Sequence, residues 1–276
     1  MRQRCTSTIS ILLLISVCMA CSLFRPKRTF AWHVILESET PSSDSEGVIK
    51  RTISIIEQRL DAAGIHNFEV VALGSSPSRQ ILVNLPEVPD RTRLVQLITT
   101  MGQLELTAIV SPPSPAPVLT FNTREEAVAQ LGKVGRENRD VLPYSEREGP
   151  ETGPQESKPS GKWVVVERPP IIDGSELRNA EAIASRRNDQ EYQISFSLRP
   201  EGAERFGVWT GSHIDEYLGV VLNGEVKSIA FIKSRISDQG VISGRFTKQS
   251  AEDLALILRS GALPAPVKII EQGSNK

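Results

Sequence analysis

Cysteine is scarce in this chain of 276 residues, and its cysteines, Cys5, Cys18 and Cys21, all lie near the N-terminus. A disulfide framework needs pairs of cysteines spread over the folded region, so we predict none. Cys18 and Cys21 have the spacing of half a zinc or redox site. Because both lie in an apolar leader rather than in a folded domain, the sequence argues against that function.

Histidine is equally scarce. His33, His66 and His213 stand far apart, and none has a second histidine or a cysteine at the spacing of metal ligands. Each is expected on the surface or partly buried. The sequence therefore predicts no metal site, and no glycine-rich phosphate loop indicates a cofactor.

Catalytic sets are also missing. Ser243 and Ser260 each precede a glycine, but neither lies in the G-x-S-x-G setting that exposes a nucleophile. Glu57 and Asp61 lie four residues apart, on what should be a solvated helix face. We predict no catalytic residue and do not expect an enzyme.

Neither excess charge nor long apolar runs mark the main part of the chain. The sequence has 32 basic and 33 acidic residues, so no general attraction to nucleic acid is expected. After Phe24 no stretch is apolar for the about 20 residues that a membrane helix needs.

The N-terminus itself has the layout of an export signal or membrane anchor, predicted over residues 1–24. Arg2 and Arg4 precede an apolar stretch from Ile9 to Ala20, which is short for a membrane helix. The small residue before Cys21 suggests a lipidation site at that cysteine. Simple cleavage and an uncleaved anchor remain the alternatives.

Residues 31–110 predict a first ferredoxin-like half, in which helices cover one face of an antiparallel sheet. Apolar residues recur at helical spacing before Gly64 and again before Gly102. The strands are expected at Trp32–Leu36, Phe68–Leu73, Gln80–Leu85 and Leu104–Val110.

Residues 111–161 are rich in proline and glycine and predict a linker or mobile insertion, with one helix at Thr123–Leu131. A disordered loop is the alternative.

A second ferredoxin-like half is predicted over residues 162–272, before a short tail at 273–276. The expected strands are Trp163–Glu167, Tyr192–Leu198, Gly219–Leu222, Glu225–Ile232, Val241–Phe246 and Val267–Ile270. The expected helices are Gly174–Ser185, one that begins at Pro200 and one capped by Thr247. Asn223-Gly224 predicts a tight hairpin. The fold class is thus α+β, and we expect both halves to share one continuous sheet.

Several segments resemble the SecD family, part of the bacterial protein-export machinery. The strongest are Leu254 to Pro266 (LALILRSGALPAP), Gly202 to Phe206 (GAERF), Leu218 to Ala230 (LGVVLNGEVKSIA) and Ile242 to Thr247 (ISGRFT). Weaker ones are Ile55 to Gly64, Ile81 to Pro86, Gly102 to Leu106 and Ile172 to Ala180. The region around Thr29 to Val34 departs from the family's D-L-x-G-G signature.

The resemblance implies the family's first periplasmic domain, held on the outer side of a bacterial membrane by the N-terminus. Its expected partners are exported unfolded polypeptide, the Sec channel and SecD-SecF subunits. The family's proton-conducting membrane bundle is not expected in this chain. Peptide addition at a sheet edge would be the physical mode of binding, although the sequence does not identify the edge.

One other function stays open, and so does one possible binding surface. The chain could be an envelope scaffold or assembly lipoprotein that reuses the domain, which its set of partners would reveal. Phe206, Trp209, Phe231 and Phe246 could line a peptide groove, but aromatic residues at helix and strand spacing are more often part of a core.

Overall fold

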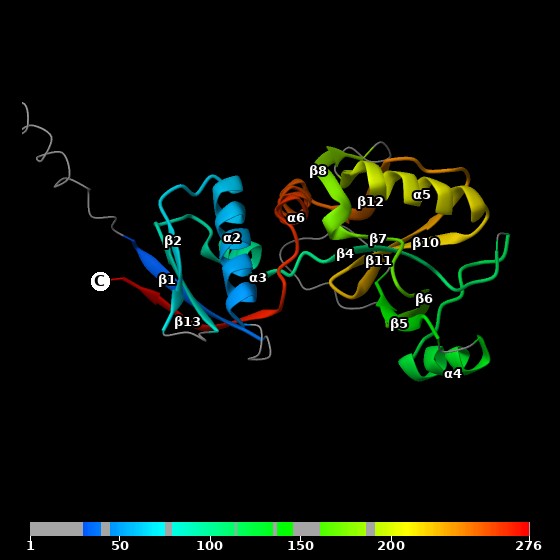
Figure 1. The fold of residues 1–276 in the computed structure, drawn as a ribbon, viewed down its shortest axis with the longest axis horizontal. Coiled ribbons are helices and arrows are strands. Elements are labelled where there is room, and N and C mark those ends of the chain that lie inside the picture. Colours follow the sequence, from blue (N-terminus) through cyan, green and yellow to red (C-terminus); the bar gives the residue numbers. More distant parts are fainter. Residues whose placement is uncertain are drawn as a thin grey trace, which may run out of the picture.

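A computed structural model describes residues 30–39, 45–74, 79–113, 115–134, 137–145, 161–185 and 191–275. The predicted leader and all three cysteines lie outside these residues. The described chain is α+β with antiparallel sheets, as the sequence predicts, and its elements form two modules (Figure 1).

The first module is a four-stranded antiparallel sheet in the order β13-β1-β3-β2, covered on one face by two helices. Its elements are β1 (Trp32–Ser38), α2 (Ser45–Ala62), β2 (Glu69–Leu73), β3 (Gln80–Leu85), α3 (Arg91–Thr99) and β13 (Val267–Ser274). Buried and half-buried residues alternate along β1 and β3, so one face of the sheet packs on the helices and the other stays open.

The sequence prediction is wrong about the fourth strand of this sheet. The segment expected to complete it, now β4 (Leu104–Ala108), pairs with β10 and β7 in the second module, and β13 takes the edge position instead. Four of the five β4 residues are buried. A strand buried on both faces belongs in the interior of a sheet, whereas the edge position leaves most of β13 exposed.

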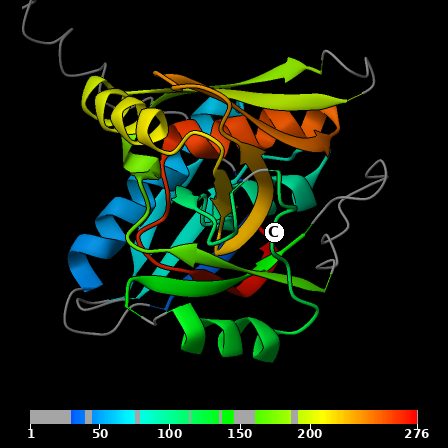
Figure 2. The same cartoon turned by 90° about the vertical axis from the view of Figure 1, so that its right-hand side faces the viewer.

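The second module contains two sheets, of six strands (β6-β5-β11-β10-β4-β7) and three strands (β12-β9-β8). Its other strands are β5 (Arg139–Tyr144), β6 (Lys162–Glu167), β7 (Ile172–Asp173), β8 (Leu177–Ala184), β9 (Tyr192–Leu198), β10 (Tyr217–Leu222), β11 (Glu225–Phe231) and β12 (Gln239–Phe246). Its helices are α4 (Arg124–Val134), α5 (Pro200–Ser212) and α6 (Lys248–Ser260). Figure 2 shows the three-stranded sheet lying over α6, with α5 beside it.

Two local predictions for this part are confirmed. Asn223 and Gly224 both adopt positive φ, at 51° and 79°, and join β10 to β11 in a tight hairpin. The helix expected within the proline-rich segment is α4. The strand β5, which follows α4 and pairs with β6, was not predicted.

The helix predicted at Gly174–Ser185 is wrong. Asp173 caps only a single 3-10 turn, and the chain then continues as β8, which pairs along its length with β9. Ala180 is buried against α6, whose Arg259 donates a hydrogen bond from Nη1 to the Ala180 carbonyl at 2.8 Å. Small side chains let the helix approach the strand, so packing overrides the helix propensity of the alanines.

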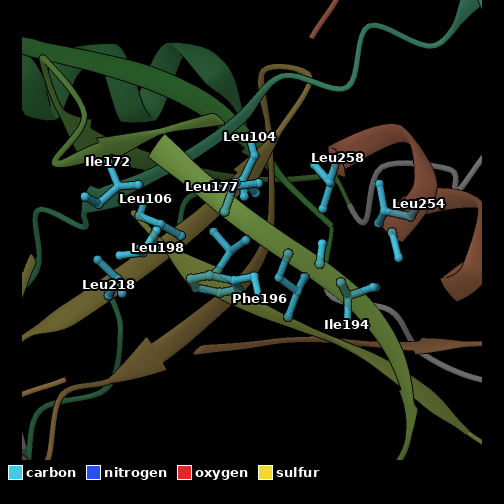
Figure 3. Packing of buried hydrophobic residues seen from close by; sticks show 14 of the residues in the cluster. Leu104, Leu106, Ile172, Leu177, Ile194, Phe196, Leu198, Leu218, Leu254 and Leu258 are labelled. Carbon is cyan, nitrogen blue, oxygen red and sulfur yellow. The ribbon is translucent and has the colours of Figure 1, made fainter. Parts of the chain in front are cut away.

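The two modules do not share one continuous sheet, contrary to the prediction; α6 joins them. Leu256 and Ile257 belong to the apolar core of the first module. Leu254, Ala255 and Leu258 belong to the core of the second, where they pack with residues of β4, β8 and β9 (Figure 3). One helix therefore contributes to both cores.

Candidate functional site

The outer strands of the three sheets differ in how far their free edges are covered. The outer edge of β6 is bonded to the proline-rich segment, because Val110 donates its backbone N–H to Val165 and Phe121 exchanges backbone hydrogen bonds with Trp163. β7 is only two residues long. Neither strand offers a long edge to another chain.

The edges of the three-stranded sheet are also restricted. β8 packs against α6, and its Ala180 carbonyl already accepts from Arg259. On the opposite side, the pairing of β12 with β9 is interrupted between Ile242 and Phe246. An irregular strand is a poor template for the regular ladder of hydrogen bonds that a further strand requires.

The outer strand β13 of the first module is as long as β8 and β12, and its pairing has a single register shift. β13 pairs with β1 over Trp32–Ser38 and contains eight residues, whereas β2 at the other edge contains five. Within the described parts of the chain, no strand pairs with the outer side of β13. We define this outer side of Val267–Ser274 as the β13 edge.

Apolar side chains are exposed along the β13 edge. Ile269 and Ile270 are 42% and 47% exposed although they are consecutive in a strand. The register shifts between Ile35 and Leu36 of β1, so that Ile270 has no direct partner there. This bulge leaves two large apolar side chains at one uncovered edge.

The charged residues of β13 are held by β1. Lys268 Nζ lies 2.9 Å from Glu37 Oε2, and the hydrogen bond from Lys268 is the main cause that lowers the pKa of the Glu37 carboxyl below its ordinary value. Glu271 lies 3.4 Å from His33 Nε2 on the same open face. Each charge has a partner on β1, although the side chains of Lys268 and Glu271 stay 58% and 60% exposed.

An uncovered outer strand such as β13 is the kind of edge to which an extended polypeptide can add. Uncovered strands expose backbone donors and acceptors that pair with another chain, and natural proteins usually protect such edges with charge or irregular structure. Here one bulge is present, and Ile269, Ile270 and Glu271 are all exposed beside it. Hydrogen bonds between the two backbones would supply affinity for an added strand, and the isoleucines would give it an apolar contact.

The chain ends of the described region emerge next to this edge. Trp32 at the start of β1 pairs with Ser274 at the end of β13, and the Asn275 backbone N–H donates to the Ala31 carbonyl at 2.9 Å. Figure 1 shows β1 and the C-terminus at the end of the molecule away from the second module. Whatever precedes residue 30 therefore attaches beside β13.

The aromatic residues considered for a peptide groove do not form one. Phe206 and Phe246 are buried in the core of the second module, and Trp209 is packed against it. Phe231 lies against Tyr217, with ring centroids 5.8 Å apart. The structure therefore assigns these side chains to packing.

The three histidines lie at separate places in the fold. His33 lies over β13, His66 is exposed with Nδ1 3.9 Å from Asp61, and His213 stacks on Trp209 with ring centroids 4.1 Å apart. Within the described residues, no group of three His, Cys, Asp or Glu side chains could hold a metal ion.

The lipidation candidate Cys21 lies outside the described residues, so it remains a prediction. The β13 edge was not found from sequence, because the strand was expected to end at Ile270 and continues to Ser274. The adjacent isoleucines, which break the alternation of a half-buried strand, were the available signal.

Two protein-family models match the chain. Residues 49–110 match the N-terminal part of the P1 domain of the protein translocase subunit SecDF, and residues 151–265 match the SecDF P1 head subdomain. The matches fall on the first module and on most of the second.

Similar sequences include two protein translocase subunits SecD. The one from Aquifex aeolicus is 34% identical over 227 residues, covering 82% of this chain and 39% of the relative. The one from Koribacter versatilis is 35% identical over 225 residues, covering 81% of this chain and 38% of the relative. The chain thus spans about two fifths of the length of these relatives.

Two solved SecDF structures share the fold. One, in a super-membrane-facing form, has a TM-score of 0.65 and 26% identity, over 95% of this chain and 34% of that chain. The other, from work on a membrane component SecDF that enhances protein export, has a TM-score of 0.61 and 26% identity, over 87% of this chain and 98% of that chain. Of the helices described here, none is long and apolar enough to cross a membrane.

Proposed function

We propose that this chain, which belongs to the SecD family of protein translocase subunits and matches their P1 domain, acts in protein export. It would do so by binding translocating polypeptide or the Sec channel. In this proposal the chain is not an enzyme and conducts no protons itself. Its N-terminus attaches it to the membrane on the extracytoplasmic side, by an anchor or by lipid on Cys21.

The observation that carries the proposal is the exposed β13 edge. An unfolded polypeptide presents extended backbone and apolar side chains, and both are complementary to an uncovered strand with Ile269 and Ile270. We propose that an exported segment or an extended segment of an export subunit adds to the sheet next to β13.

The position of this edge agrees with attachment through the N-terminus. The segment before residue 30 leaves the module beside Ser274, because Trp32 and Ser274 are paired. A membrane anchor or lipid on that segment would keep the β13 edge near the membrane, where exported chains emerge. The predicted division into two halves with an insertion between them stays part of the proposal, with β13 in place of β4 as the fourth strand of the first half.

The proposal is tested by photocrosslinking in intact cells. A photoreactive amino acid replaces Ile270 in one tagged full-length chain and Val71 in another, which is the matched control because Val71 is 38% exposed on the opposite edge strand. Crosslinked partners are purified and identified by mass spectrometry.

We expect position 270 to capture unfolded precursors, Sec channel components or SecD-SecF subunits more strongly than position 71. Recovery of outer-membrane or wall proteins alone would contradict the export function and support the alternative of an envelope scaffold. Equal capture of export partners at both positions would leave the family function intact and remove the β13 edge as the binding site.

A further inference from the structure

Hydrogen bonds at the two ends of β13 show which of its backbone groups face outward. The Pro266 carbonyl accepts from the Glu39 N–H, and the Asn275 N–H donates to the Ala31 carbonyl, both at 2.9 Å, so both end residues direct these groups toward β1. In an antiparallel pair, successive residues direct their backbone groups alternately to one side and to the other. Counting inward from each end gives the direction for every residue outside the bulge.

Lys268 and Glu271 direct their backbone groups toward β1. The residues that direct theirs to the β13 edge are Val267, Ile269, Gln272 and Ser274. A strand added at this edge would form its hydrogen bonds with these four residues. It would meet Lys268 and Glu271 only through their side chains.

The side chains of Lys268 and Glu271 lie on the same face of the sheet. They pair in register with Glu37 and Ile35, which are half-buried residues on the open face of β1. Ile269 pairs with a buried residue of β1 and therefore belongs to the helix-covered face. Along the open face of β13, a cation and an anion thus stand at the two ends of the bulge.

These charges occupy the positions of closest contact with an added antiparallel strand. Residues whose backbone groups point away from a neighbouring strand form non-hydrogen-bonded pairs with it, with Cα atoms about 4.5 Å apart instead of about 5.5 Å. Side chains approach most closely in such pairs. Opposite charges there stabilise the pairing, and like charges destabilise it.

The partners on the first module do not cancel the two charges. Glu37 is shared between Lys268 Nζ at 2.9 Å and Arg79 Nη2 at 3.8 Å, so two cations surround one carboxylate and leave an excess of positive charge. Glu271 lies 3.4 Å from His33 Nε2, and histidine is charged only when it is protonated. At alkaline pH the end of the bulge at Glu271 therefore keeps an excess of negative charge.

The direction of an added strand follows from the rest of the sheet. All strand pairs of the first module are antiparallel, and antiparallel pairing is slightly more stable per residue than parallel pairing. An antiparallel chain passes Glu271 first and Lys268 second. On β1 the residues opposite these two, Ile35 and Glu37, are two positions apart, because the bulge in β13 takes up the extra residue.

We propose that the β13 edge prefers polypeptide segments in which a basic residue stands two positions before an acidic residue, with an apolar residue between them. The basic side chain pairs with Glu271, the acidic one with Lys268, and the apolar one lies beside Ile269 on the other face. This inference rests on the proposed function, since it concerns the same edge. Both charges are exposed, so the preference is modest and other extended segments still bind.

The test compares two peptides of identical composition. Both have blocked ends and uncharged flanks of threonine and valine, and their centres read Lys-Val-Glu in one and Glu-Val-Lys in the other. Fluorescence anisotropy measures their affinities for the full-length chain at low salt and about pH 8. We expect the Lys-Val-Glu peptide to bind about fivefold more tightly. The preference should disappear in about 1 M salt, where charges are screened within about 3 Å.

Exchanging the charges on the protein gives the sharpest comparison. The double variant Lys268→Glu, Glu271→Lys should bind the Glu-Val-Lys peptide more tightly, which reverses the preference of the parent. Glu69→Lys is the matched control, because Glu69 is exposed on β2 at the opposite edge, and it should keep the preference of the parent. Equal affinities of the parent for both peptides, or a preference that survives the charge exchange, would overturn the inference.

Ile270→Lys separates this inference from the proposed function. If the parent binds both peptides equally and Ile270→Lys weakens both, the edge is the binding site and only the charge preference is wrong. If Ile270→Lys leaves the affinity for both peptides unchanged, or if the parent binds neither peptide, the β13 edge is not the site and the preference is overturned with it.

Discussion

Arg93 of α3 binds both carboxylate oxygens of Asp253 in α6, with Nε 3.0 Å from each oxygen and Nη2 2.7 Å from Oδ1. The pair connects a helix of the first module to the helix that enters both cores. The hydrogen bonds that Arg93 donates to Asp253 are the main cause that raises the pKa of Arg93. Two arginines thus lie where the modules meet. Arg59 is buried and donates hydrogen bonds to backbone carbonyls, whereas Arg93 is partly exposed and binds a carboxylate.

The partly exposed pair should contribute modestly to stability. Asp253→Asn keeps the shape of the side chain and removes its charge, and we expect a loss of about 1 kcal/mol in the free energy of unfolding, as for a well-formed pair near the surface. Urea unfolding measures it. Glu252→Gln, whose ion pair with Lys248 spans 3.9 Å, is the control and should change little. A loss of about 3 kcal/mol or more would mean that the pair behaves as a buried one.

Close packing at the connection between the two modules predicts a strong effect of Gly102→Ala. The added Cβ meets Ile257 and Arg59 in addition to the unfavourable positive φ. Gly64→Ala is the control, since Gly64 has a φ of 79° but nothing within 4 Å of the added atom. We expect Gly64→Ala to cost about 1 kcal/mol and Gly102→Ala roughly 1–3 kcal/mol more, measured by urea unfolding. Equal costs would contradict the packing argument.

The ion pair across β1 and β13 predicts a pH effect. The pKa of Glu37 is lowered in the folded chain by the hydrogen bond from Lys268, so its contribution to stability is present above the ordinary pKa and is lost as the pH falls through the folded value. Lys268→Met should raise the pKa of Glu37, which NMR titration of its carboxyl carbon measures. An unchanged Glu37 pKa in Lys268→Met would show that a group other than Lys268 lowers this pKa.

The hairpin turn predicts a local effect at the start of β4. Asn223 adopts a φ of 51°, and its Oδ1 accepts a hydrogen bond from the Gln103 backbone N–H at 3.0 Å. Asn223→Ala loses this bond and puts alanine at positive φ, so we expect a cost of roughly 1–2 kcal/mol and faster amide exchange at Gln103. Asn223→Gly, which loses only the bond, should cost less. Amide exchange that is unchanged in both variants would contradict this assignment.

Local signals in the sequence predicted the elements that local chemistry determines. The Asn223-Gly224 turn, the proline at the start of α5 and the Thr247 cap of α6 are all found in the structure. The family resemblance, carried by the segments on these elements, is shown by the comparisons.

Pairing between distant segments could not be predicted in the same way. The segment of β8 contains alanine and glutamate, which favour a helix, and only contact with β9 and α6 makes it a strand. β13 likewise joins the first sheet through β1, whose Trp32 pairs with Ser274, 242 positions away, 274 minus 32. Which strands pair is decided by how the whole module buries its apolar residues, and a local sequence pattern does not show this.

Arg59 and the β13 edge had weak signals in the sequence for the same reason. Arg59 follows Ile55 and Ile56 at helical spacing and therefore lies on the apolar face of α2, which is unusual for a charged residue. The sequence does not show that carbonyls at 97, 100, 101 and 261 surround it. The β13 edge similarly depends on which strand remains outermost.

The most direct measurement for the central claim is the affinity of the full-length chain for a permanently unfolded, fluorescently labelled export precursor, compared between the parent, Ile270→Lys and Val71→Lys. Lysine on an edge strand opposes the addition of another strand, so Ile270→Lys should weaken binding by about tenfold, while Val71→Lys should leave it unchanged. Equal affinities for parent and Ile270→Lys, or equal losses in both variants, would contradict binding at the β13 edge.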